Sequence, residues 1–249
     1  MMHRPNVADP GRIMAHRGAS LAKPENTLGA MRTAAAQGAW WIEFDVSLLG
    51  DGTPILHHDA TLDRCTDTSG ALADLGIADL EGIDSGDGEP VATLEQALDL
   101  IEELGLYANL EMKPHAEPTG RMAGIVADML IARDWTQSRI LVSSFWHAEL
   151  DAIRALMPEQ PLAVLFRDPG DDWAATCDRL AAAAMHVRFD YLSSGLISAV
   201  RRRSMDIRTY TANDPEAVAP FRERGLTGVI TDHPPFYLDR EDWRNWNAA

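Results

Sequence analysis

Short runs of apolar, β-branched and aromatic residues alternate along the chain with longer stretches whose apolar residues recur at helical spacing. This alternation is typical of repeated strand–helix units, in which a helix returns the chain to the next parallel strand. The runs predict eight strands, at residues 12–16, 40–46, 106–111, 139–144, 161–166, 185–190, 206–211 and 227–231. Because each of the first seven strands is followed by a helix, we predict an α/β fold in the form of a closed (β/α)8 TIM barrel.

Two of the predicted helices have distinct signals. In residues 27–37, Leu28, Met31 and Ala35 form one apolar stripe. Thr93 and Gln96 form a capping box, which predicts that another helix begins at Leu94.

One connection is much longer than the others, because residues 47–92 separate the second strand from the helix at Leu94. Such a long insertion in a compact domain is usually functional. It begins with a hairpin-like stretch, residues 48–56, in which Asp51-Gly52 predicts a tight turn. Residues 82–90 form an acidic, glycine-rich run that lacks the spacing of an EF-hand, so we expect a surface turn there.

The length of 249 residues suits one catalytic barrel domain spanning residues 1–249, with residues 47–92 as an insertion within it. No segment approaches the roughly 20 apolar residues of a membrane span. Residues 1–11 lack the apolar run of a secretory signal, so we expect a cytoplasmic protein without a membrane anchor. The two cysteines, Cys65 and Cys177, lie far apart in sequence and are expected to be free thiols.

The charge balance is strongly acidic, with 22 Lys and Arg against 38 Asp and Glu and a formal net charge of −16. Such a chain repels polyanions unless a local basic patch intervenes. The short basic run at residues 201–203 is interpreted as a solvated helix end. Nucleic acid and anionic membranes are therefore poor partners, and a small molecule is expected instead.

Carboxylates gather at the predicted C-terminal ends of two strands. Glu43 and Asp45 are two residues apart in one strand, so their side chains point to the same side, as do Glu111 and Lys113 in the next. Either pair alone fits a salt bridge at the barrel mouth, but barrel enzymes keep their active sites at these strand ends. Clustered carboxylates are costly unless one is protonated or a cation lies between them, and Mg²⁺ or Ca²⁺ suits such oxygen ligands.

Two histidines can join the same mouth. His16 and Arg17 end the first strand, followed by Gly18, and His58 lies inside the long insertion. Two imidazoles beside a phosphodiester supply one group that takes the proton of the nucleophile and one that protonates the departing alcohol oxygen. Arg17 suits a phosphate, and neither a GxSxG motif nor a convincing Cys/His pair is present.

Five ordered motifs together resemble the glycerophosphodiester phosphodiesterase family, in particular its compact bacterial cytosolic branch. They are His16-Arg17-Gly18, Pro24-Glu25-Asn26-Thr27, Glu43-Phe44-Asp45, His58-Asp59 and Glu111-Met112-Lys113. Later stretches that include Ser143-Ser144-Phe145, Tyr210-Thr211-Ala212-Asn213 and residues 228–232 are similar to the family's later strand ends, so the resemblance runs from about residue 12 to residue 235.

The resemblance implies a role for each matched residue. Glu43, Asp45 and Glu111 would bind one divalent cation, Mg²⁺ or Ca²⁺. His16 and His58 would be the acid/base pair, with His57 as the alternative to His58. Arg17 and Lys113 would hold the phosphate, while Glu25 and Asn26 would support the first loop. Phe145 and Tyr210 would line the pocket for the leaving group or else pack in the core.

The expected activity is metal-dependent hydrolysis of glycerophosphodiesters, such as glycerophosphocholine or glycerophosphoethanolamine, to sn-glycerol 3-phosphate and an alcohol. The alternatives are a lysophospholipid-directed phosphodiesterase of the same fold and a non-catalytic protein that binds phosphate esters. The preferred alcohol, the choice of cation, the oligomeric state, and the choice between direct attack by water and a cyclic phosphate intermediate stay open.

Overall fold

The computed structural model describes residues 11–115, 119–133 and 139–248. Residues 1–10, which make up most of the stretch from which we expect no secretory signal, lie outside this description. The strands are β1 (Ile13–His16), β2 (Trp41–Leu48), β3 (Pro54–Leu56), β4 (Tyr107–Met112), β5 (Ile140–Ser144), β6 (Leu162–Phe166), β7 (Ala184–Arg188), β8 (Asp206–Tyr210) and β9 (Gly228–Thr231).

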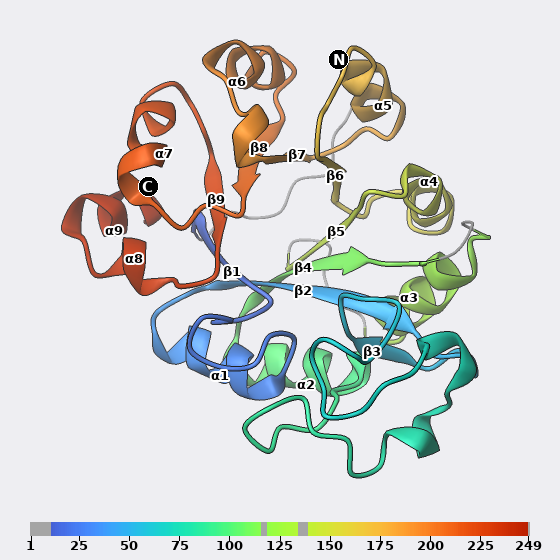
Figure 1. The fold of residues 1–249 in the computed structure, drawn as a ribbon. Coiled ribbons are helices and arrows are strands. Elements are labelled where there is room, and N and C mark those ends of the chain that lie inside the picture. The colour runs from blue at the N-terminus through green and yellow to red at the C-terminus, as the bar shows by residue number, and fades with distance from the viewer. Residues whose placement is uncertain (1–10, 116–118, 134–138, 249) are drawn as a thin grey trace.

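Helices lie between these strands and surround them (Figure 1). They are α1 (Leu28–Ala36), α2 (Leu94–Leu104), α3 (Arg121–Ala132), α4 (His147–Leu156), α5 (Trp173–Arg179), α6 (Ser194–Arg201), α7 (Pro215–Arg222), α8 (Pro235–Leu238) and α9 (Glu241–Asn247). The described residues also form the 3-10 helices η1 (Leu72–Asp74), η2 (Ile77–Leu80) and η3 (Phe189–Tyr191).

The eight parallel strands close into a barrel. Neighbours pair in the order β1-β9-β8-β7-β6-β5-β4-β2, and β1 also pairs with β2, which joins the two ends of the sheet. The predicted TIM barrel is therefore confirmed. Helices α8 and α9 follow the eighth barrel strand, where the sequence pattern predicted none.

The predicted strands agree with the observed ones to within two residues at each end. Residues 189 and 190, expected at the end of a strand, begin the 3-10 helix η3 instead. The strand pattern continues into this segment because aromatic residues favour strands, but a βα connection turns the chain away from the barrel here. Both predicted helix starts are confirmed: Thr27 caps α1, and Thr93 with Gln96 forms the capping box of α2.

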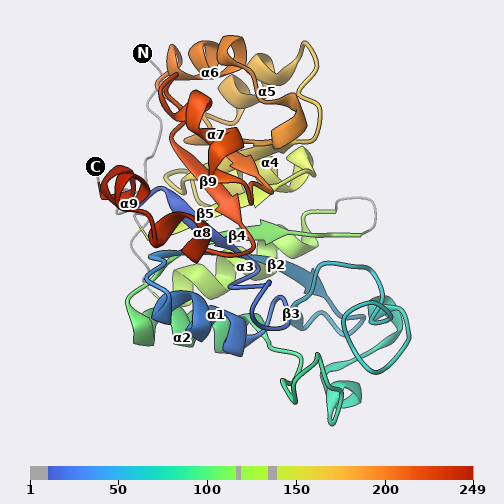
Figure 2. The ribbon, with the colours of Figure 1, turned by 60° about the vertical axis from the view of Figure 1, so that its left-hand side comes forward.

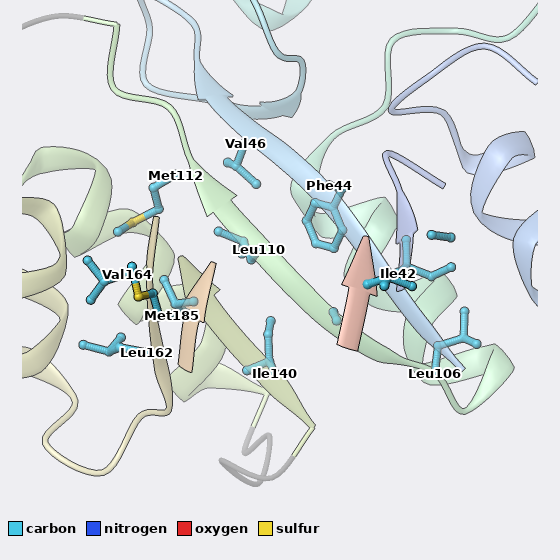
Figure 3. Close-up of a cluster of buried hydrophobic side chains, with 14 of the residues drawn as sticks. Ile42, Phe44, Val46, Leu106, Leu110, Met112, Ile140, Leu162, Val164 and Met185 are labelled. Carbon is cyan, nitrogen blue, oxygen red and sulfur yellow. The ribbon is translucent and has the colours of Figure 1, made fainter. Parts of the chain in front are cut away.

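The residues of β2 show how the fold separates core from site. Ile42, Phe44 and Val46 lie in the main hydrophobic cluster, together with Leu110 and Met112 of β4 (Figure 3). The alternate residues Glu43 and Asp45 point into the barrel, because successive side chains of a strand face opposite sides. A second apolar cluster inside the barrel contains Met14, Trp41, Leu141, Ala163, Ala184 and Ile230. Together these clusters support strand ends that carry charged side chains.

The long connection after β2 forms its own small unit. As predicted, residues 48–56 form a hairpin, in which β3 pairs antiparallel with the end of β2. The segment packs around a separate apolar cluster of Leu49, Ile55, Leu62, Leu72, Leu80, Ile83 and Val91. Figure 2 shows it beside the barrel, on the side to which the arrowheads of β4 and β9 point. It therefore stands next to the C-terminal ends of the strands.

Neither Cys65 nor Cys177, both within the described part of the chain, takes part in a disulfide. No helix in the described part of the chain has both the length and the apolar character that crossing a membrane requires.

Candidate active site

Three carboxylates meet at the C-terminal ends of β2 and β4. Glu43 and Asp45 come from β2 and Glu111 comes from β4, where Asp45 and Glu111 are direct partners in the parallel register. Their side chains are buried, with 1%, 1% and 6% of each residue exposed, and one oxygen from each lies within 4.8 Å of the others. The predicted acidic cluster is thus brought together.

The electrostatics of the three groups show that their charges are not fully balanced. Burial, reinforced by Asp45 and Glu111, raises the pKa of Glu43 well above its ordinary value. Burial likewise raises the pKa of Glu111 to about 7, against the opposing effect of Lys113. Burial acts in the same direction on Asp45, but the charges of Lys113 and Arg17 outweigh it and lower the pKa of that carboxyl.

One oxygen of the cluster also lacks a hydrogen-bond donor. Among the described residues, Glu43 Oε1 is buried and has no such partner. Burying a charged oxygen without a partner is costly, and oxygen ligands of this kind suit a hard divalent cation. The cluster of Glu43, Asp45 and Glu111 therefore fits Mg²⁺ or Ca²⁺ by the chemistry of its donor atoms.

Arg17 folds back over the carboxylates. Its backbone N–H donates to Glu43 Oε2 at 2.9 Å, and its Nε lies 3.1 Å from Asp45 Oδ2. This turn needs a left-handed backbone at Arg17 (φ 56°) and at Gly18 (φ 79°). A Cβ on Gly18 would lie 2.7 Å from the carbonyl carbon of Ala30, so only glycine fits. Gly18 therefore fixes where Arg17 sits.

Lys113 approaches the carboxylates from β4. Its Nζ lies 3.3 Å from Asp45 Oδ1 and also contacts Glu111. Although burial alone would lower the pKa of Lys113, the charges of Asp45 and Glu111 raise it, so the side chain is a cation at neutral pH. With Arg17 it places two positive groups beside three acids.

Asn26 ties the first loop to β2. Its Nδ2 donates to Asp45 Oδ2 at 2.9 Å, and its Oδ1 accepts from the backbone N–H of Asp45 at 3.0 Å. Its own N–H donates to the carbonyl of Arg17 at 3.0 Å. Glu25, the neighbouring residue, accepts from Arg17 Nη1 at 2.6 Å. Glu25 thus contacts Arg17 of the first loop, and Asn26 links this loop to Asp45 of β2.

His16 is held by a carboxylate that the sequence reasoning did not select. His16 Nδ1 and Asp232 Oδ1 are 2.6 Å apart, and His16 Nε2 lies 4.0 Å from Glu43 Oε2. Although burial acts in the opposite direction, hydrogen bonds from His16 and Asn213 lower the pKa of Asp232 to about 2, so it is ionised and accepts the Nδ1 proton. The position of Asp232 directly after the eighth barrel strand was the sequence signal that could have identified it.

The structure separates the adjacent histidines of the insertion. His58 is 32% exposed at its side chain, and its Nδ1 lies 2.6 Å from Asp59 Oδ1. His57 is buried, and its Nε2 lies 2.8 Å from the carbonyl oxygen of Thr61. Burial lowers the pKa of His58, with an opposing effect from Asp45. His58 rather than His57 is therefore accessible and oriented by a carboxylate.

Phe145 and Tyr210 are half-buried at the C-terminal ends of β5 and β8. Their rings meet edge to face with centroids 5.9 Å apart, and Lys113 Nζ lies 5.5 Å from the centroid of Phe145. The Tyr210 hydroxyl donates to the carbonyl oxygen of Phe166 at 2.9 Å, and burial raises the pKa of this phenol. This pair forms an aromatic wall next to Lys113.

Open space adjoins one of the two histidines. A cavity of about 280 Å³ is lined by His16, Arg17, Ser20, Leu21, Glu25 and Asp232. His16 and Arg17 therefore face a space that can hold a small ligand.

Comparison with known proteins gives a consistent result. Residues 16–235 match the glycerophosphoryl diester phosphodiesterase family. The Bacillus subtilis protein YhdW is 30% identical over 91% of this chain and 96% of its own length. The glycerophosphodiester phosphodiesterase of Caldanaerobacter subterraneus is 27% identical, over 89% of this chain and 94% of its own length.

A solved structure agrees with both relatives. An Oleispira antarctica phosphodiesterase, determined in complex with the product sn-glycerol-3-phosphate, is 30% identical and has a TM-score of 0.85, with 90% of this chain and 93% of that chain covered. The resemblance drawn from the five motifs is confirmed. The chain belongs to the glycerophosphoryl diester phosphodiesterase family and is a glycerophosphodiester phosphodiesterase.

Proposed function

We propose that the enzyme hydrolyses glycerophosphodiesters such as glycerophosphocholine and glycerophosphoethanolamine to sn-glycerol 3-phosphate and the free alcohol, by a cation-dependent mechanism with two histidines. The observation that carries this proposal is the pair His16 and His58. Each uses Nδ1 to contact an aspartate at 2.6 Å, and they come from two different elements beside one group of carboxylates. The product bound to the Oleispira antarctica relative supports the choice of product.

The division of labour follows from these contacts. Because Nδ1 of each ring is engaged by a carboxylate, Nε2 is the atom that exchanges a proton with the substrate. One imidazole takes the proton of the attacking hydroxyl group, and the other donates a proton to the oxygen of the departing alcohol. The attacking group is water or the 2-hydroxyl of the glycerol, since both routes need the same acid and base.

The cationic side chains have a separate task. Arg17 and Lys113 would balance the charge of the phosphoryl oxygens, which is the main requirement of phosphoryl transfer. Glu43, Asp45 and Glu111 would hold a divalent cation. When bound, such a cation supplies further positive charge to the phosphate group. Phe145 and Tyr210 would face the alcohol, next to Lys113.

The test is turnover of glycerophosphocholine by three histidine variants. His16→Ala and His58→Ala should each lower kcat by at least roughly a hundredfold, because each removes one proton-transfer group. His57→Gln serves as the matched control, since its amide can still donate to the carbonyl of Thr61. Turnover close to that of the unmodified enzyme in either alanine variant would remove that histidine from the proposed pair.

A further inference from the structure

Arg64 of the insertion joins two carboxylates that hold different parts of the site. Its Nε donates to Asp59 Oδ2 at 2.5 Å. Its Nη1 and Nη2 donate to the two oxygens of Glu25 at 2.9 and 2.8 Å. One planar guanidinium therefore bridges the insertion and the first loop, using three of its donors.

Each of these carboxylates has a second partner with a proposed function. The other oxygen of Asp59 contacts His58 Nδ1 at 2.6 Å. Glu25 Oε1 also accepts from Arg17 Nη1 at 2.6 Å. Contacts thus run without a break from His58 through Asp59, Arg64 and Glu25 to Arg17.

We propose that Arg64 is a positioning residue, which holds His58 and Arg17 in one geometry by joining Asp59 to Glu25. This inference rests on the proposed function, since it gives His58 and Arg17 their roles. Two carboxylates that carry the same charge repel each other across the gap that Arg64 fills. A lysine at this position could not reproduce the fork, because its ammonium is a single point of charge.

The contribution of Arg64 to stability is expected to be small. Its side chain is 48% exposed, and salt bridges of exposed groups are worth little because solvent screens them. Arg32 offers a matched comparison. It is 53% exposed and donates Nη1 and Nη2 to the two oxygens of Glu103, but it lies on α1 and contacts no residue of the site. A merely structural role predicts similar behaviour for both arginines.

The surroundings of Arg64 allow a test by chemical rescue. The side chain lines an open cavity of about 400 Å³ together with Pro24, Glu25, Cys65, Thr66, Asp67, Asp84, Ser85 and Gly86. A free guanidinium ion has the same planar donors as the removed group and can enter from solvent. Rescue requires only tens of millimolar, far below the molar range in which guanidinium unfolds proteins.

The experiment measures turnover of glycerophosphocholine and the unfolding temperature of the full chain. Arg64→Ala should lower kcat roughly tenfold to a hundredfold, as loss of a residue that orients catalytic groups typically does, with little change in unfolding temperature. Added guanidinium should raise the kcat of Arg64→Ala several-fold. The kcat of Arg64→Lys should stay below that of the rescued alanine variant. Arg32→Ala should keep the original rate and should not respond to guanidinium.

Two results would overturn the role of Arg64: a kcat for Arg64→Ala within about twofold of the unmodified enzyme, or a loss that guanidinium leaves unchanged. His58→Ala distinguishes this failure from failure of the proposed function. If His58→Ala loses activity while Arg64→Ala keeps it, only the positioning role is wrong. If His58→Ala keeps its activity, the proposed mechanism itself is wrong.

Discussion

Asp232 offers a test of how His16 is oriented, through exchange of one carboxylate for an amide. Asp232 Oδ2 accepts from Asn213 Nδ2 at 2.6 Å, while Oδ1 faces His16 Nδ1. The side-chain amide of Asn213 cannot flip, because its Oδ1 already accepts from Thr231 Oγ1 and from the backbone N–H of Asp232. In D232N, the new carbonyl group must therefore face Asn213, and the new NH₂ group must face His16.

This orientation reverses the hydrogen bond at His16. The NH₂ group donates to Nδ1, so the proton of the neutral imidazole moves to Nε2. A protonated Nε2 of a neutral ring cannot accept a proton from the nucleophile. The conservative amide therefore places His16 in the tautomer that does not serve as a base.

The magnitude follows from the bond that is lost. A hydrogen bond to a charged group contributes about 1.5–3 kcal/mol, and about 1.36 kcal/mol corresponds to tenfold in rate, so D232A should lower kcat roughly 10- to 160-fold. With His16 as the base of the pair, D232N adds the cost of the wrong tautomer and should lose at least as much. In a Ser-His-Asp triad the same exchange lowers kcat by about 10⁴.

The assay is release of sn-glycerol 3-phosphate from glycerophosphocholine at neutral pH. D239N is the matched control, because Asp239 is exposed and lines a different cavity, beside Gln37, Gly38 and Trp40. A D232N variant that is more active than D232A, or whose kcat lies within about threefold of the unmodified enzyme, would contradict this role of Asp232.

Two further predictions concern stability. Burial, aided by the charge of Arg208, holds the pKa of His186 well below its ordinary value of 6.5. Below pH 6.5 the unfolded chain binds a proton at this residue and the folded chain does not, so folding loses about 1.4 kcal/mol per pH unit from this group. In His186→Gln, the free energy of unfolding measured with urea should decline less steeply between pH 6.5 and 5. A slope equal to that of the unmodified protein would contradict this. Gly18→Ala should lower the free energy of unfolding by about 1 kcal/mol or more, because of its positive φ and the contact with Ala30. An unchanged unfolding midpoint would show that this turn relaxes freely.

Local patterns were sufficient to predict the barrel and to group the charged residues of β2 and β4 in the candidate site. Alternation within β2 placed Glu43 and Asp45 on one side, and the same rule applied to Glu111 and Lys113 in β4. These predictions need only the period of a strand and the rule that barrel sites lie at C-terminal strand ends. The closure of the barrel brought the two pairs together, as the register of Asp45 with Glu111 shows.

Contacts between distant residues were beyond the reach of local patterns. His16 and Asp232 are 216 positions apart, and Arg64 and Glu25 are 39 apart. Neither pairing follows from periodicity. The choice between His57 and His58 likewise depended on burial within the insertion, whose short turns follow neither the helical nor the strand period. The sequence favoured His58 only through the resemblance, with His57 kept as the alternative.

We propose that Glu43, Asp45 and Glu111 hold a divalent cation on which turnover depends. The most direct measurement is release of sn-glycerol 3-phosphate from glycerophosphocholine by protein stripped with a chelator, before and after addition of Mg²⁺ or Ca²⁺. We expect turnover to disappear on stripping and to return with one of these cations. Full turnover by the stripped protein would contradict it.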